Sequence, residues 1–255
     1  MVGRKLELLF PKRHAEIGDE ILRVENLSTS DLVKRVSFSI RKGEVLGFSG
    51  LVGSGRTETM RAIFGADRKT SGEIRYFGKK VDIKNPKQAI KLGIGFLPED
   101  RKTQGLVLKQ PIRINTTLVS RQGNGFINHR QEKEEGKSLL AQIATKYGST
   151  EDNADSLSGG NQQKVALAKW LAIDMKLIIL DEPTRGVDVG AKTEIYRIIN
   201  ELAERGVGVI IISSEMEEII GTCDRVIVMR EGQITGEVAK EDLTESNLIK
   251  LAMGV

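Results

Sequence analysis

A glycine-rich turn has the residue types and spacing of a phosphate-binding loop. The apolar run Val45–Phe48 precedes the turn Gly50–Thr57, and a helical pattern follows it through Phe64. Glycines let backbone N–H groups turn towards an anion, and a helix N-terminus adds partial positive charge. The turn fits the pattern G-x-x-x-x-G-K-[ST] except that Arg56 replaces the lysine. Taken alone, it is equally typical of an ordinary tight connection from strand to helix.

Two carboxylates follow a second apolar run. Leu177–Leu180 is typical of a buried parallel strand, and Asp181 and Glu182 come directly after it. Ligands of open α/β sheets bind at this edge, where the strands end. Asp181 is therefore expected to hold Mg²⁺ together with the Thr57 hydroxyl, and Glu182 to polarise an attacking water. A pair of solvated acids is the alternative interpretation, and the glycine-rich turn in the same chain makes it the weaker one.

A second helix start also has the features of an anion-binding site. In the stretch 157–164, Ser158 is followed by two glycines and then by a helical pattern. One chain cannot easily bring two such anion-binding helix starts to a single phosphate. We therefore predict that this helix start faces a phosphate held by a partner.

Composition narrows the class of protein. The 255 residues are 39% hydrophobic and 29% charged, which is ordinary for a soluble globular chain of one large domain. The net charge of +4 comes without a dense basic run, and aromatic residues make up only 4%, so nucleic-acid binding is not expected. Cys223 is the only cysteine, which excludes an intrachain disulfide and predicts a core residue. No apolar run approaches membrane-spanning length and the start is too polar for a signal peptide, which predicts a cytoplasmic protein.

The elements that must position these residues alternate between strand and helix. This order predicts an α/β fold: a P-loop NTPase core with a mainly parallel sheet, an attached small antiparallel β subdomain and an inserted helical subdomain at about residues 99–157. Residues 1–19 are expected to be a linker, and residues 20–255 the nucleotide-binding domain. We expect strands over residues 21–27, 35–40, 45–48, 73–78, 93–98, 177–180, 207–212, 225–229 and 233–238, and helices after residue 57, from residue 86, over about 130–147, 161–174 and 191–205, and at the C-terminus.

Several motifs together resemble a known family. LSGGNQQKVALA followed by LIILDEPTRGVDVGAK resembles the signature, Walker B and D-loop series of ABC-type ATPases. With GLVGSGRTE, FLPEDRKTQGLVL and ISSEMEEI, the chain from about residue 21 to 255 resembles the second half of the tandem ATP-binding subunit of bacterial ribose, galactose and xylose importers. The resemblance implies the ABC ATPase fold and ATP hydrolysis coupled to monosaccharide uptake. Residues 1–19 then resemble the tail of a missing upstream half.

The resemblance also implies roles for individual residues, with ATP and Mg²⁺ as cofactors. Asp181 and Thr57 would bind Mg²⁺, Glu182 would be the catalytic base, and Asp188 would be the D-loop aspartate that links two sites. The phosphates of this half's nucleotide would be bound by Gly50, Gly53, Ser54, Gly55, Arg56 and Thr57. The nucleotide of the opposing half would be contacted by the signature residues Ser158, Gly159, Gly160, Asn161 and Gln162.

Four departures from the family pattern fall in this half's own site. Arg56 replaces the P-loop lysine, Glu99 stands at the Q-loop glutamine position, and Ser214 stands at the switch histidine position. No aromatic residue lies near Ser30 and Asp31, where adenine usually stacks. Arginine is bulkier than lysine and fork-shaped, and serine supplies no cation. We therefore predict that this half's own nucleotide site is degenerate and hydrolyses ATP slowly or not at all. Its signature motif would serve the competent site of the partner half.

The resemblance finally implies partners. These are a first ATP-binding half, membrane permease subunits contacted through about residues 99–118, and, indirectly, a periplasmic or extracellular sugar-binding protein. The chain would then lie on the cytoplasmic face of the membrane. An ordinary charged loop is the alternative for residues 99–118. For the whole chain the alternatives are a regulatory nucleotide-binding module that does not hydrolyse ATP, and a soluble ABC ATPase acting on nucleic acid.

Overall fold

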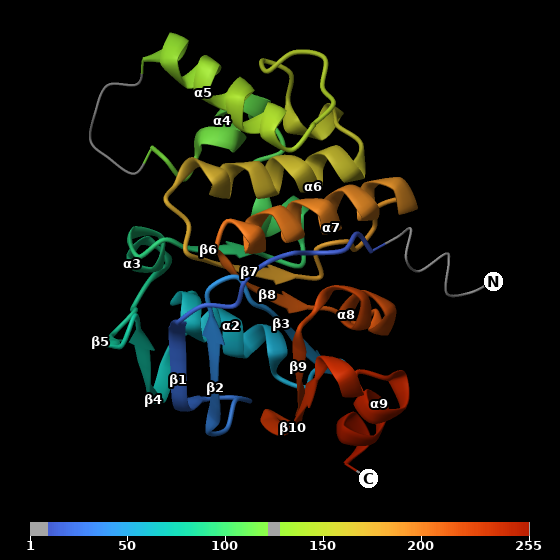
Figure 1. The fold of residues 1–255 in the computed structure, drawn as a ribbon. Coiled ribbons are helices and arrows are strands. Elements are labelled where there is room, and N and C mark those ends of the chain that lie inside the picture. The colour runs from blue at the N-terminus through green and yellow to red at the C-terminus, as the bar shows by residue number, and fades with distance from the viewer. Residues whose placement is uncertain (1–9, 122–127, 255) are drawn as a thin grey trace, which may run out of the picture.

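A six-stranded sheet forms the centre of the molecule (Figure 1). The computed structural model describes residues 10–121 and 128–254. The strand order is β10-β9-β3-β8-β7-β6; all neighbours are parallel except β10 and β9, which confirms the predicted mainly parallel sheet. Its strands are β3 (Val45–Gly50), β6 (Ile94–Leu97), β7 (Leu177–Asp181), β8 (Gly208–Ile212), β9 (Arg225–Arg230) and β10 (Gln233–Ala239).

The second sheet is small and antiparallel, as predicted. Its order is β2-β1-β4-β5. Burial alternates along β2, so its inner face joins the core while its outer face is solvated. The rings of Phe38 on β2 and Phe48 on β3 meet edge to face with centroids 5.0 Å apart, which connects the two sheets. The four strands are β1 (Glu20–Thr29), β2 (Val36–Arg41), β4 (Lys69–Tyr76) and β5 (Lys79–Val81).

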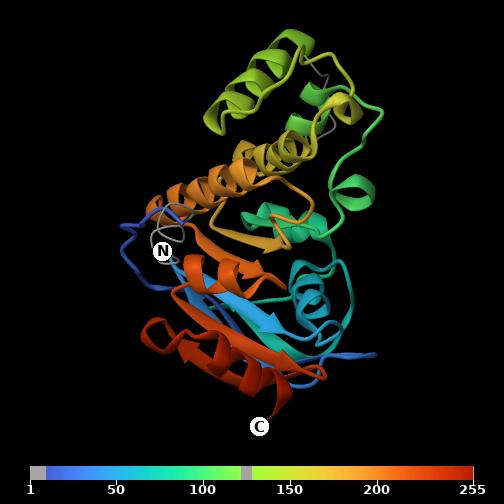
Figure 2. The same ribbon diagram turned by 90° about the vertical axis from the view of Figure 1, so that its right-hand side faces the viewer.

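Helices cover the central sheet and build the insertion beside it (Figure 2). Strands β7 and β8 are buried at every residue, because helices pack on both faces. Cys223 is fully buried and its Sγ lies against Gly47, which confirms it as a core residue. The helices are α2 (Arg56–Phe64), α3 (Pro86–Lys91), α4 (Ile112–Thr117), α5 (His129–Gln142), α6 (Gly159–Ala168), α7 (Val189–Glu204), α8 (Met216–Thr222) and α9 (Glu245–Met253).

Two predicted helices differ from the observed ones. The helix expected over about 130–147 ends at Gln142, because Ala144 adopts the left-handed conformation (φ 48°) and the Thr145 N–H bonds back to the Leu140 carbonyl at 3.0 Å. The helix expected over 161–174 starts at Gly159, and its last turn, Lys169–Ala172, is a 3₁₀ helix. Helices α4 and α8 were not predicted at all.

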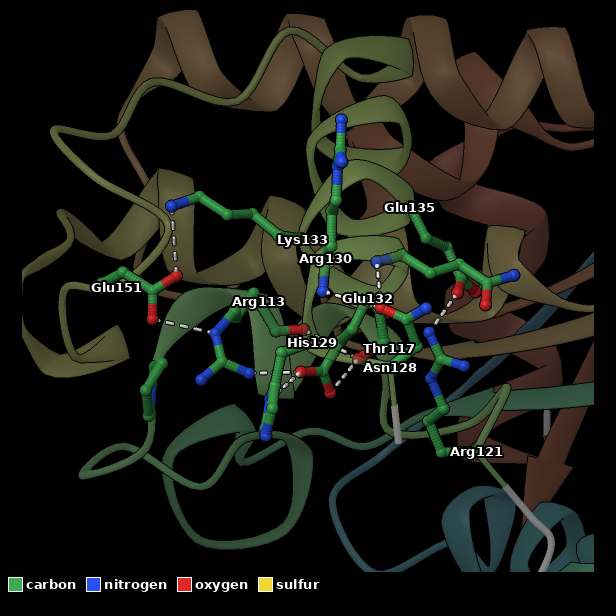
Figure 3. Close-up of polar contacts among 12 residues, drawn as sticks. Arg113, Thr117, Arg121, Asn128, His129, Arg130, Glu132, Lys133, Glu135 and Glu151 are labelled. Atoms are coloured by element: carbon green, nitrogen blue, oxygen red, sulfur yellow. Dashed lines mark hydrogen bonds and ion pairs between the residues drawn. The ribbon is translucent and has the colours of Figure 1, made fainter. Parts of the chain in front are cut away.

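Ion pairs hold the helical insertion together (Figure 3). Arg113 of α4 pairs with the buried Glu132 of α5 and donates to Glu151 at 2.8 Å. Thr117 donates to the same Glu132 at 3.3 Å. Buried carboxylates need such partners, since an unpaired buried charge is costly. The network therefore fixes α4 against α5 and against the loop around Glu151.

The segment 10–18 runs along the outside of the central domain without forming a helix or strand. Figure 1 shows it in blue, passing between α7 and α8 before it enters β1. The first nine residues of the predicted linker lie outside the described residues. Within residues 10–121 and 128–254, no helix combines the length and the apolar character that crossing a membrane requires.

Candidate functional site

The glycine-rich turn connects β3 to α2 in the predicted way. Gly50 has φ 148°, and a Cβ atom there would lie 2.2 Å from the Met229 carbonyl oxygen. Gly55 caps α2 with φ 97°, a conformation that residues with side chains rarely adopt. The turn thus needs glycine at both positions, and it directs the start of α2 towards the carboxyl ends of the neighbouring strands.

A cavity of about 610 Å³ lies over this turn. It brings together four regions that are far apart in the sequence: the glycine-rich turn with the start of α2, the segment after β6, the loop after β7 and the loop after β8. Gly50 and Asp188 are not among the lining residues, nor is any aromatic residue of the described chain. The lining residues are Val52, Gly53, Ser54, Gly55, Arg56, Thr57, Glu58, Glu99, Asp181, Glu182, Arg185, Gly186, Ile212, Ser214 and Glu215.

Asp181 and Thr57 meet in this cavity. The Thr57 hydroxyl donates to Asp181 Oδ2 at 2.8 Å, and Asp181 is only 1% exposed. Burial raises the pKa of Asp181 from its ordinary 3.8 to about 6, although the bond from Thr57 acts in the opposite direction. In the described residues, Asp181 Oδ1 and Ser54 Oγ are buried without hydrogen-bond partners. Two unpartnered oxygens fit a hard cation such as Mg²⁺ and its phosphate ligands.

Glu182 and Ser214 face each other across the loops after β7 and β8. The Ser214 hydroxyl donates to Glu182 Oε2 at 3.1 Å. Burial raises the pKa of Glu182, and the bond from Ser214 lowers it. Glu182 also adopts a left-handed backbone (φ 48°), which is unusual outside glycine. The carboxylate is thereby held beside the cavity, in a position to accept a proton.

Arg56 is turned into the protein rather than out into solvent. Its Nη1 donates to the Ser213 carbonyl at 2.9 Å, and the residue is 8% exposed. Burial lowers its pKa, while the nearby carboxylates of Glu182 and Asp181 raise it. The guanidinium therefore lies between the glycine-rich turn and the loop after β8, with one nitrogen already bonded.

Glu99 lies at the edge of the cavity and pairs with Arg185. Arg101 donates from Nη1 to the Arg185 carbonyl at 2.8 Å, so the two arginines link the start of the insertion to the loop after β7. Sequence reasoning did not single out Arg101 or Arg185. Both arginines lie within sequence motifs on which the family resemblance depends. Their place in those motifs is the only feature of the sequence that could have indicated them.

The signature residues lie outside the cavity, at the start of α6. Ser158 is exposed and caps the helix by accepting from the Asn161 N–H at 3.4 Å. Gly159 is partly exposed, while Gly160 and Gln162 are buried. The Gln162 side chain donates to the Leu157 carbonyl at 3.1 Å, so it is directed into the protein. None of the five residues lines the cavity, so the two helix starts do not converge.

Asp188 caps α7 and follows Gly186, a residue of the cavity lining, by two positions. Its Oδ1 accepts from the Ala191 N–H at 3.0 Å, the geometry of an N-cap. Gly160 packs tightly beside this helix start, since a Cβ atom on it would lie 2.8 Å from the Ala191 Cβ. The starts of α6 and α7 are therefore packed against each other.

Sequence relatives place these features in a family. A model of the ABC transporter family matches residues 33–185. The whole chain is 52% identical to the ribose import ATP-binding protein RbsA of Lactococcus lactis subsp. cremoris and covers 52% of it. It is 50% identical over its whole length to the protein of the same name from Bacillus subtilis, again covering 52%. The chain thus spans about half the length of the curated relatives it matches.

Solved structures show the same fold. A nucleotide-free ATP-binding cassette from an ABC transporter superposes with a TM-score of 0.77 at 24% identity, covering 91% of this chain and 98% of the other. An ATP-binding cassette in its ADP conformation gives 0.77 at 23% identity, with 93% and 100% covered. From the matched family model, the relatives and the fold, we conclude that the chain belongs to the ABC transporter family.

Proposed function

We propose that this chain is one nucleotide-binding half of the tandem ATPase of a bacterial monosaccharide importer. Two observations support the proposal. The relatives that match along the whole chain are named as ribose import ATP-binding proteins, and the chain spans about half of their length. The activity would be ATP hydrolysis coupled to sugar uptake, with ATP and Mg²⁺ bound in the 610 Å³ cavity.

The residues of the cavity suggest how this half would bind a nucleotide and what each side chain would contribute to its hydrolysis. Backbone N–H groups of the turn Gly53–Thr57 would bind the phosphates at the start of α2. Asp181 and Thr57 would hold Mg²⁺, which supplies charge neutralisation to the phosphates when bound. Glu182 would accept a proton from the attacking water, because burial raises its pKa towards neutral pH and so makes the carboxylate a stronger base.

We further propose that this half's own site is degenerate. The observation that carries this proposal is that three departures from the family pattern, Arg56, Glu99 and Ser214, all line the same cavity. Arg56 donates to a backbone carbonyl, Glu99 pairs with Arg185, and Ser214 donates to Glu182. Each side chain is thus bonded within the protein, and Ser214 has no positive charge to offer a γ-phosphate.

The signature would act on the nucleotide of the other half. Ser158 and Gly159 are accessible at the N-terminus of α6, where N–H groups and the helix dipole favour an anion. They lie outside the cavity of their own chain, so a phosphate would have to come from a partner. Asn161 is partly exposed beside them. The buried Gly160 and Gln162 would support this surface from inside.

The partners follow from the same proposal. Besides the first ATP-binding half, these are permease subunits at the cytoplasmic face of the membrane, with a sugar-binding protein acting through them. The segment 99–118 would contact the permease; it carries the exposed apolar residues Val107 (48%) and Leu118 (47%). Exposed apolar side chains of this size are typical of contact surfaces when they cluster.

Steady-state ATP hydrolysis tests the proposal. We expect the chain alone to be nearly inactive, and a mixture with a separately produced first half to gain activity. Ser158→Ala should reduce that gain, whereas Ser156→Ala, an exposed serine two residues away, should leave it unchanged. Full activity of the chain alone would refute the degenerate site.

Two further measurements separate the alternatives. Turnover by this chain when paired with a catalytically blocked first half would exclude the regulatory module that does not hydrolyse ATP. Salt-dependent nucleic-acid binding in the micromolar range would favour the soluble ATPase acting on nucleic acid.

A further inference from the structure

The segment 10–18, here called the strap, is anchored to two helices that are remote in sequence. The Phe10 ring packs on the Tyr196 ring of α7, with centroids 4.8 Å apart. It also occupies a notch at Gly221 of α8, where a Cβ atom would lie 2.5 Å from the ring. The Asn200 side chain of α7 donates to the Pro11 carbonyl at 2.7 Å. The strap therefore contacts α7 and α8 together.

Polar contacts continue along the strap. Arg13 pairs with Asp224 and donates to the Thr222 carbonyl at 3.0 Å, at the end of α8. The His14 N–H donates to Glu204 at 3.0 Å, at the end of α7. Both contacts lie at the C-terminal ends of these helices. The N-terminal ends of the same helices follow the loops that line the cavity.

A buried acid lies between the strap and those loops. Glu218 of α8 is 1% exposed, and burial raises its pKa to about 7. The side chains of Tyr196, Thr184 and Ser213 surround it, yet neither carboxylate oxygen has a well-formed hydrogen bond among the described residues. A buried carboxylate that lacks hydrogen bonds lowers the stability of the fold, so its presence calls for an explanation.

The neighbours of Glu218 point to a reason. Thr184 is two residues after Glu182, and Ser213 precedes Ser214 and accepts from Arg56 at 2.9 Å. Glu218 thus touches both loops that position the acidic side of the cavity. Tyr196 touches Glu218 on one side and Phe10 on the other. Contacts between side chains thus connect the strap to the two loops that line the cavity.

We propose that the strap holds α7 and α8 in register and, through Tyr196 and Glu218, positions the loops that carry Glu182 and Ser214. Tyr196 and Glu218 are positioning residues, since neither lines the cavity. This proposal rests on the proposed function, because the two loops matter for activity only if the cavity is the ATP site. Chain before residue 10 would act on α7 and α8 through the strap, since Phe10 contacts both helices.

Hydrogen exchange of the chain without nucleotide tests the proposal. Phe10→Ala should speed exchange in the loops 182–188 and 212–216 about tenfold, the change that 1.4 kcal/mol of lost local stability produces. Glu218→Gln should affect the same loops, and the double variant should add little to either single one, because both act along one path. Asn200→Ala, which removes one strap contact, is the milder variant should Phe10→Ala not fold.

Phe77→Ala is the control for the loss of an aromatic ring, since Phe77 is 41% exposed, follows β4 and packs on the Tyr76 ring with centroids 4.8 Å apart. It should leave both loops unchanged. A second readout is the affinity for Mg·ATP, which Phe10→Ala should weaken about fivefold, a modest coupling between distant sites.

Exchange that rises only next to the strap, or equally in every strand, would overturn the proposal. So would strictly additive effects of Phe10→Ala and Glu218→Gln. Since exchange is measured without nucleotide and without a first half, high ATPase activity of the chain alone would refute the degenerate site and leave the strap's role standing.

Discussion

Asp181→Asn is expected to stabilise the chain when no divalent cation is present, and increasingly so as the pH rises. Asp181 is 1% exposed, its Oδ2 accepts from Thr57 at 2.8 Å, and its Oδ1 has no partner among the described residues. The folded chain therefore carries a carboxylate that burial disfavours. Asparagine keeps the shape and removes the charge.

The size of the effect follows from the pKa, which burial raises from 3.8 to about 6. Because the folded pKa is the higher one, the folded chain holds a proton that the unfolded chain has released, and stability falls as the pH rises through this window. Linkage gives a cost of about 1.6 kcal/mol at pH 5 and about 3 kcal/mol at pH 8, relative to the protonated acid. Any constant difference between Asn and protonated Asp cancels between the two pH values, so the advantage of the variant should grow by about 1.4 kcal/mol.

Urea unfolding of wild type and variant at pH 5 and pH 8, in chelator, measures this difference directly. Asp174→Asn is the control, because that side chain is 87% exposed, and its effect should not change with pH in this way. Adding Mg²⁺ at pH 8 should stabilise the wild type and not Asp181→Asn, since only the carboxylate binds the cation well. An advantage of Asp181→Asn that stays flat or shrinks from pH 5 to pH 8 would refute the reasoning.

Two further predictions concern packing around the signature and the insertion. Gly160→Ala should lower stability by about 1–3 kcal/mol in thermal unfolding, because the new Cβ would lie 2.8 Å from the Ala191 Cβ and force α6 from α7; an unchanged melting temperature would contradict this close packing. Arg113→Ala should cost about 3 kcal/mol, because the buried Glu132 loses its guanidinium partner, and adding Glu132→Gln should recover part of the loss in urea unfolding. No recovery in the double variant would show that the pairing is not the cause.

The central part of the fold could be predicted because its signals are local. Runs such as Leu177–Leu180 contain enough β-branched and apolar residues to specify a buried strand, and the glycines of the turn at 50–57 specify its backbone. The cavity that joins Thr57, Asp181 and Ser214 follows once these strands are parallel, because their carboxyl ends meet at one edge.

The parts that could not be predicted depend on distant contacts. Helix α4 contains Ile112, Thr116 and Thr117, β-branched residues that disfavour an isolated helix, and it forms because these three side chains are buried. The contacts of the strap could not be predicted, because they join residues far apart in the sequence: Asn200 and Pro11 are separated by 189 positions. No periodicity within residues 10–18 reveals such a partner.

The charges of the cavity lining support our proposal that this half's own site is degenerate. Its lining includes the acids Glu58, Glu99, Asp181, Glu182 and Glu215, against the bases Arg56 and Arg185. Arg185 is already paired with Glu99, so Arg56 is the remaining cation of the lining, and it is bonded to the Ser213 carbonyl. A triphosphate entering this cavity would meet the carboxylates of Glu58, Asp181 and Glu182, since Glu99 and Glu215 are paired with Arg185 and Lys192, and a serine at position 214 adds no cation. Under our proposal of a degenerate site, Arg56 keeps its positive charge but directs Nη1 at the Ser213 carbonyl, and Ser214 carries no charge, so we predict that nucleotide binding here depends strongly on Mg²⁺.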